Sequence, residues 1–147
     1  MKRLYLVIAI GLFFQINSLS AAEVISLTQT ACQFIESENG VDHRFTATSA
    51  EACERLNEQG GEVRLKNSEP LRLKPGEYVF RVSNRDGPYR LGFWLRGAGL
   101  SRLTRPSVSG GGLHTGAVTD YTVNLEAGEY RYSCPLNPTP DYVLIVE

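Results

Sequence analysis

Apolar and polar residues alternate along two segments in the second half of the chain. The apolar positions of these segments are Tyr78, Phe80 and Val82 in the first and Tyr130, Tyr132 and Cys134 in the second. A period of two places alternate side chains on one face of a strand, so each set predicts a buried face. A glycine turn precedes each segment, in the phrases KPGEYVF and EAGEYRY. We therefore expect two turn-then-strand units.

Further short apolar segments predict strands at residues 24–27, 71–73, 90–95, 121–125 and 142–146. Short strands separated by turn residues favour a mainly β protein built as an antiparallel sandwich. Residues 100–119 lack this alternation and contain three consecutive glycines at positions 110–112, so most of this stretch is predicted to be loop.

One short helix is predicted near the N-terminus. Thr48 and Glu51 have the spacing of a capping box, which marks the start of a helix. Ala52, Cys53 and Leu56 would share one helix face. The pair of glycines at 60 and 61 is expected to end the helix, because glycine commonly follows the last helical turn.

The first 22 residues have the pattern of a secretory signal peptide. Lys2 and Arg3 precede an apolar run from Leu4 to Ile16, and the small residues Ser20 and Ala22 follow it. The run is shorter than the roughly 20 residues that a membrane-spanning helix needs. We expect cleavage after Ala22, a single domain over residues 23–147, a periplasmic or secreted location, and no membrane span after cleavage.

Charge is unevenly distributed along this domain. Loss of Lys2 and Arg3 leaves 13 basic and 16 acidic residues, a net charge of −3, which argues against nucleic-acid binding. Between positions 81 and 119, however, six arginines face one acid, Asp86. This segment is interpreted either as a docking face for an acidic partner or anionic headgroups, or as solvated surface balanced by acids elsewhere. Trp94, Arg90 and Arg96 are the candidate partner-binding residues, because aromatic and arginine side chains are enriched at interfaces.

The chain has three cysteines, so at most one intramolecular disulfide can form. Cys32 and Cys53 both lie outside the repeating strand pattern, and we favour this pair, although either other pairing is compatible with the sequence. Cys134 would then be a free thiol that points inward at the end of its strand. Three roles are open for it: metal ligand, inert buried thiol, or reactive thiol.

Three phrases, LRLKPGEYVFRVSN, GPYRLGFWLRG and VNLEAGEYRYSCPLNPTPDYVLIV, together resemble the cupredoxin family. The resemblance extends over roughly residues 71–147. It implies a Greek-key β-sandwich and an activity in electron transfer or copper handling outside the cytoplasm. It also implies that Cys134 occupies the position of the family's cysteine ligand.

Apart from Cys134, the usual copper ligands of that family are missing here. A type 1 copper site needs two histidines, a cysteine and usually a weak axial methionine. Residues 135–147 contain neither histidine nor methionine, and Met1 is the only methionine. His114, in the phrase GGGLHTG, could approach Cys134 and form a site for Cu(I). His43, in VDHRF, is interpreted as a surface residue.

Two functions therefore follow from the sequence. The first is an exported protein that binds copper in a nonstandard site at Cys134 and His114, for metal handling or electron transfer. The alternative is a metal-free binding module for a periplasmic or extracellular protein partner. An enzyme is not expected, because the sequence has no nucleophile motif beside a positioned histidine, no phosphate-binding loop and no CxxC zinc spacing.

Overall fold

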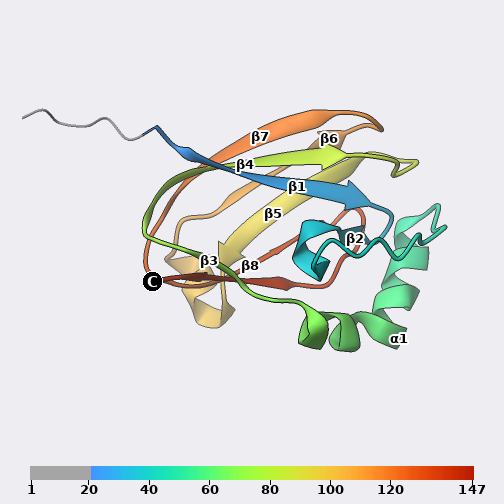
Figure 1. Ribbon diagram of the computed structural model, residues 1–147, viewed down its shortest axis with the longest axis horizontal. Coiled ribbons are helices and arrows are strands. Elements are labelled where there is room, and N and C mark those ends of the chain that lie inside the picture. Colours follow the sequence, from blue (N-terminus) through green and yellow to red (C-terminus); the bar gives the residue numbers. More distant parts are fainter. Residues whose placement is uncertain (1–20) are drawn as a thin grey trace, which may run out of the picture.

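The computed structural model describes residues 21–147, which form a mainly β protein with two mixed sheets (Figure 1). The predicted signal peptide lies, apart from its last two residues, outside the described residues. The four-stranded sheet has the order β2 (Gln33–Phe34), β1 (Glu23–Thr30), β4 (Gly76–Asn84), β7 (Val118–Leu125). The five-stranded sheet has the order β3 (Leu71–Leu73), β9 (Tyr142–Val146), β8 (Gly128–Ser133), β5 (Leu91–Gly97), β6 (Val108–Leu113).

Two of the strand pairs are parallel, so the prediction of purely antiparallel sheets is wrong. Leu27 of β1 pairs with Val82 of β4, and Leu71 of β3 pairs with Leu144 of β9, each in a parallel register. Parallel neighbours require a long connection between the strands. The connection from β1 to β4 supplies it, since it contains the 3-10 helix η1 (Glu36–Glu38) and the helix α1 (Ala50–Asn67).

The glycine-rich stretch is partly a strand, which corrects the prediction of a loop. Val108–Leu113 forms β6 and pairs antiparallel with β5, with an irregularity between Leu91 and Phe93. Glycine has low strand propensity, so the sequence shows no alternation there. Packing explains one of the glycines, because a Cβ at Gly110 would lie 2.8 Å from Cε1 of Tyr121.

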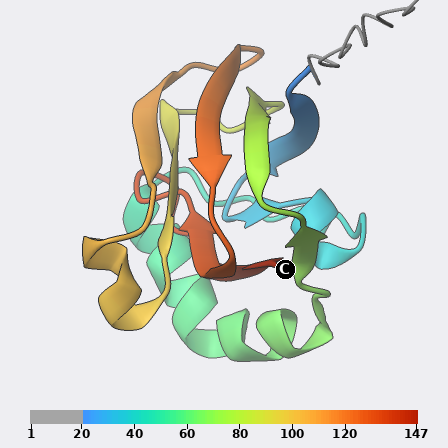
Figure 2. The same ribbon diagram turned by 90° about the vertical axis from the view of Figure 1, so that its left-hand side faces the viewer.

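Helix α1 is longer than predicted and follows two strands instead of lying near the N-terminus. Its N-cap is Ser49 and not the predicted Thr48. The Oγ of Ser49 accepts a hydrogen bond from the N–H of Ala52 at 3.3 Å. The helix continues through both central glycines. Gly61 is buried, and a Cβ at this position would lie 3.9 Å from Cγ of Pro140. Such packing outweighs the roughly 1 kcal/mol by which a glycine destabilises the interior of a helix. Figures 1 and 2 show α1 outside both sheets.

The alternating positions are buried, as predicted. Tyr78, Phe80, Val82, Tyr130, Tyr132 and Cys134 all belong to one hydrophobic cluster, to which both sheets contribute. Phe34 of β2 lies in this cluster and packs edge-on against Phe93 and Tyr142. Full burial of a large apolar side chain contributes about 1.5–3 kcal/mol, so this shared core is the main source of stability.

Candidate functional site

Cys134 follows β8 directly and begins the turn at residues 134–138 that leads to β9, which we call the Cys134 turn. Its side chain is fully buried. Its sulfur accepts hydrogen bonds from two backbone N–H groups, those of Gly92 and Asn137, each at 3.2 Å. Burial raises the pKa of the Cys134 thiol, although these backbone N–H groups act in the opposite direction. The thiol therefore stays protonated and serves as a hydrogen-bond acceptor that shapes the turn.

Asn137 connects this turn to the N-terminal part of the chain. Its Oδ1 accepts hydrogen bonds from the N–H of Cys32 at 2.8 Å and the hydroxyl of Tyr89 at 2.9 Å. Its Nδ2 donates to the carbonyl of Thr30 at 2.8 Å, and its Oδ1 lies 3.2 Å from Sγ of Cys53. Asn137 is fully buried with its polar atoms satisfied. No sequence signal marks it, because its partners come from distant segments.

The Cys32–Cys53 disulfide is present, as predicted. Both cysteines are fully buried and form a second small hydrophobic cluster with Ala31 and Ala47. Cys134 remains the free cysteine of the described chain. The disulfide therefore ties the end of β1 to the first turns of α1, and Asn137 links it to the Cys134 turn.

His114 lies at the same end of the five-stranded sheet as Cys134, because Leu113 pairs with Leu91, the residue before Gly92. The side chain of His114 is nevertheless exposed, whereas the thiol of Cys134 is buried. Across residues 21–147, no group of three or more His, Cys, Asp or Glu residues could hold a metal ion. The hydrogen-bond donors to the sulfur are the backbone N–H groups of Gly92 and Asn137, and the ring of His114 is not among its hydrogen-bond partners in the described residues.

Two oxygen atoms beside the turn are buried and have no hydrogen-bond partner among the described residues. They are Oε1 of Gln29 and the hydroxyl of Tyr121. The Nε2 of Gln29 donates to the carbonyl of Gly92 at 2.7 Å, and burial raises the pKa of Tyr121. Cu(I) prefers thiolate and imidazole to such hard oxygen ligands, so these atoms do not complete a copper site.

The arginine-rich segment is partly balanced by acids. Arg81 pairs with Asp120 at 2.7 Å, and Arg85 pairs with Asp42 at 2.7 Å. Arg96 is 9% exposed, and its guanidinium pairs with Asp141 at 2.7 Å. Arg90, by contrast, is exposed. The candidate partner residues thus differ in environment: Arg90 faces solvent, while Arg96 is enclosed.

Arg96 supports Trp94 from one side. Its guanidinium carbon lies 4.0 Å from the centroid of the Trp94 ring, and its NH1 donates to Oγ of Ser133 at 3.1 Å. Such a cation–π contact contributes about 0.5–2 kcal/mol. Arg96 therefore fixes the orientation of Trp94, which is itself half-buried.

Trp94 borders an apolar hollow of about 410 Å³, which we call the Trp94 hollow. Its lining consists of Phe93, Trp94, Ser109, Gly110, Gly111, Pro135 and Leu136. Leu136 is 46% exposed although it is a large apolar residue. It belongs to the Cys134 turn, whose sulfur and Asn137 hold the backbone around it. The buried thiol thus helps to present an exposed apolar side chain.

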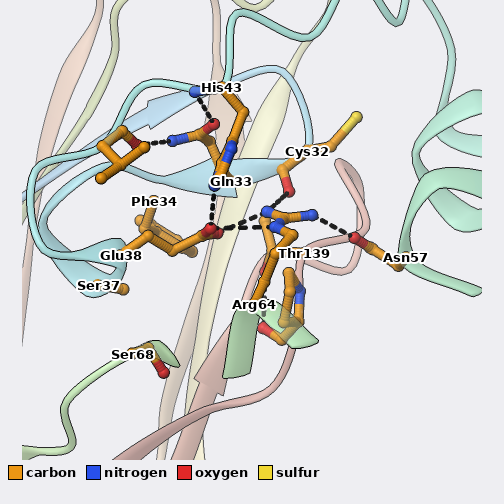
Figure 3. A network of polar contacts seen from close by, with 12 residues as sticks. Cys32, Gln33, Phe34, Ser37, Glu38, His43, Asn57, Arg64, Ser68 and Thr139 are labelled. Carbon is orange, nitrogen blue, oxygen red and sulfur yellow. Dashed lines mark hydrogen bonds and ion pairs between the residues drawn. The ribbon is translucent and has the colours of Figure 1, made fainter. Parts of the chain in front are cut away.

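The most densely connected polar cluster lies elsewhere, around Glu38 of η1 (Figure 3). The guanidinium of Arg64 in α1 pairs with Glu38 through two hydrogen bonds, at 2.5 and 3.0 Å. The ring Nε2 of His43 lies 2.6 Å from Oε2 of Glu38, and the hydroxyl of Tyr142 in β9 donates to Oε1. We call these four residues the Glu38 cluster. His43 is a surface residue in that 32% of its side chain is exposed, but it also closes this cluster.

Electrostatics keep the Glu38 carboxylate ionised. Burial alone would raise its pKa, but hydrogen bonds from Arg64 and Tyr142 outweigh burial and lower it. Burial, together with the Glu38 charge, raises the pKa of Tyr142. Burial raises the pKa of the neighbouring Tyr132 to about 12. Its arrangement joins η1, α1 and β9, so we interpret the cluster as a structural clasp.

The described residues contain no helix that is both long and apolar enough to cross a membrane. A scan against protein-family models finds no match to the chain, and a search of curated proteins finds none either.

Proposed function

We propose that this chain is an exported, cupredoxin-like Greek-key β-sandwich that works as a metal-free binding module for a protein partner, without enzymatic activity. The observation that carries the proposal is the Trp94 hollow, an apolar depression with an aromatic residue on one side and the exposed Leu136 on the other. The Cys32–Cys53 disulfide is compatible with export, because disulfides persist in oxidising compartments.

The hollow has the features of an interface anchor point. Aromatic residues held in a fixed orientation lose little entropy on binding, and Arg96 holds Trp94 in this way. Gly111 keeps the depression open, since a Cβ there would lie 3.2 Å from Cδ1 of Leu136. An apolar side chain of a partner would enter between Trp94 and Leu136, and the exposed Arg90 would favour acidic neighbours on that partner.

Selection of peptides from a displayed random library against the purified protein tests this surface. We expect the selected peptides to bind the wild type and to bind Trp94→Ala and Leu136→Asp at least about tenfold more weakly, which corresponds to about 1.4 kcal/mol. Val63→Asp is the matched control, because Val63 is an exposed apolar residue of α1, 60% accessible. Selected peptides that bind all four proteins equally would refute the Trp94 hollow as the binding surface.

The copper alternative is tested on the same proteins. Wild type, Cys134→Ala and His114→Ala are titrated with Cu(I) under reducing conditions, and the retained metal is measured after desalting. We expect equal and negligible retention, because backbone N–H groups occupy the surroundings of the sulfur. Stoichiometric retention that Cys134→Ala abolishes would contradict the metal-free proposal and establish copper binding.

A further inference from the structure

A second hollow, of about 460 Å³, lies between α1 and the loop that precedes it. It shares no lining residue with the Trp94 hollow. The helix contributes Ala52, Arg55, Leu56 and Gln59, whose spacing places them along one face. The loop contributes Arg44 and Phe45. We call this depression the Arg44–Arg55 hollow.

The Arg44–Arg55 hollow is positively charged. Two arginines and no acidic residue line it, and both arginines are exposed. In the part of the chain that the structure describes, neither guanidinium forms a salt bridge. The neighbouring acids have other main partners: Asp42 pairs with Arg85 at 2.7 Å, and hydrogen bonds from the backbone N–H of Glu51 and from Ser49 lower the pKa of Glu51 more than the charge of Arg55 does.

The walls of this hollow are held in place before any ligand arrives. Arg44 has a left-handed backbone with φ of 54°, and its N–H donates to Oδ1 of Asp42 at 2.8 Å. A non-glycine residue in this conformation costs about 1–3 kcal/mol and persists only where its surroundings enforce it. The ring of Phe45 stacks on His43 at 5.2 Å, and the guanidinium of Arg64 lies 4.9 Å from its centroid. The loop is thus fixed by the Glu38 cluster.

We propose that the Arg44–Arg55 hollow binds a small organic oxyanion, a carboxylate or phosphate group carried on a compact apolar body. Guanidinium groups bind such oxyanions through paired charge-assisted hydrogen bonds, and here one comes from the loop and one from the helix. Phe45 and Leu56 supply apolar surface to the same hollow. The volume lies within the usual range of small-molecule sites. This site is independent of the partner surface at the Trp94 hollow.

Benzoate and phenyl phosphate are suitable probes, with phenol as the uncharged analogue and inorganic phosphate as the anion without an apolar body. Each is titrated into the ¹⁵N-labelled protein, and amide shifts are followed by NMR. We expect saturable shifts at residues 44–47 and 52–59 with benzoate or phenyl phosphate. Phenol and inorganic phosphate should each bind at least about tenfold more weakly, because each lacks one of the two interactions.

The variants Arg44→Gln and Arg55→Gln remove one guanidinium each and should each weaken binding about tenfold. Arg102→Gln, an exposed arginine in the 3-10 helix η2 (Gly99–Leu103), is the matched control and should bind like the wild type. Three results would overturn the proposal: no saturable shifts with either aromatic anion, equal binding of phenol, or equal weakening by the control. None of them bears on the Trp94 hollow, because peptide binding there is measured separately.

Discussion

The Glu38 cluster and the Cys134 turn are both buried, yet they stabilise their polar groups in opposite ways. Glu38 is a charged group that three side chains contact, two of them from the distant elements α1 and β9. Cys134 is a neutral thiol that only backbone N–H groups contact. A buried charge requires ion-pair and strong hydrogen-bond partners, whereas a buried neutral thiol needs only weak hydrogen bonds. The comparison teaches that the residue with the more reactive chemistry, Cys134, has the simpler structural task.

Removal of the Arg64 charge should have the largest effect on stability. Arg64→Met leaves the Glu38 carboxylate buried without its cation, which costs about 3–5 kcal/mol in unfolding free energy. Urea denaturation followed by circular dichroism measures this loss. Arg102→Ala, on an exposed arginine, should change stability by less than about 0.5 kcal/mol. The double variant Glu38→Leu with Arg64→Met should recover more than half of the loss, and a single-variant loss below about 1 kcal/mol would contradict the clasp.

Removal of the Cys134 sulfur should have an intermediate effect. Cys134→Ala leaves the N–H groups of Gly92 and Asn137 without an acceptor, which costs about 1–3 kcal/mol. Cys134→Ser retains an acceptor atom and should lose less. The same urea denaturation compares the two variants. If Cys134→Ala were as stable as the wild type, the sulfur would not shape the turn.

The pH dependence of stability should be the smallest of these effects, with opposite signs in the two regions. The pKa of Glu38 is lowered in the folded state, so its contribution is present above the pKa of the unfolded chain and is lost as pH falls through the folded pKa. The pKa of Cys134 is raised, so the unfolded chain loses the thiol proton first, and stability falls as pH rises above about 8.5.

Two variants separate these contributions. Unfolding free energies measured from pH 3 to 7 should depend less on pH in Glu38→Gln than in the wild type. Between pH 8 and 9.5, below the range in which Tyr132 ionises, the decline should be smaller in Cys134→Ser. If the unfolding free energies of both variants changed with pH in parallel with the wild type, the ionisation of Glu38 and Cys134 would not contribute to the pH dependence of stability.

The strands of the core could be predicted because alternation is a local property. The alternation of Tyr78, Phe80 and Val82 predicts a buried face without reference to any other segment. Strand β6 could not be predicted in this way, because its three glycines have no side chains to alternate between the two faces. The end of α1 was also missed, since the contact of Gly61 with Pro140 exists only in the folded chain.

The candidate sites divide in the same way. Cys134 and Trp94 stood out by residue type and position on a strand. The Glu38 cluster did not, because Glu38, Arg64 and Tyr142 lie far apart in sequence and each resembles an ordinary surface or core residue. Asn137 was missed for the same reason. Leu136 gains its importance only from its exposure, which the sequence does not reveal.

The burial of Cys134 near the native disulfide has a consequence for oxidative folding. Three cysteines permit three single-disulfide pairings in an unfolded chain, and the native structure contains one of them, Cys32–Cys53. Exchange between pairings proceeds by attack of a thiolate, and an unfolded Cys134 can make that attack. Once Cys134 is buried beneath its turn, its sulfur can no longer attack a disulfide. Burial of Cys134 should therefore lock the Cys32–Cys53 pairing, and only chains that form one of the other two pairings first need to reshuffle.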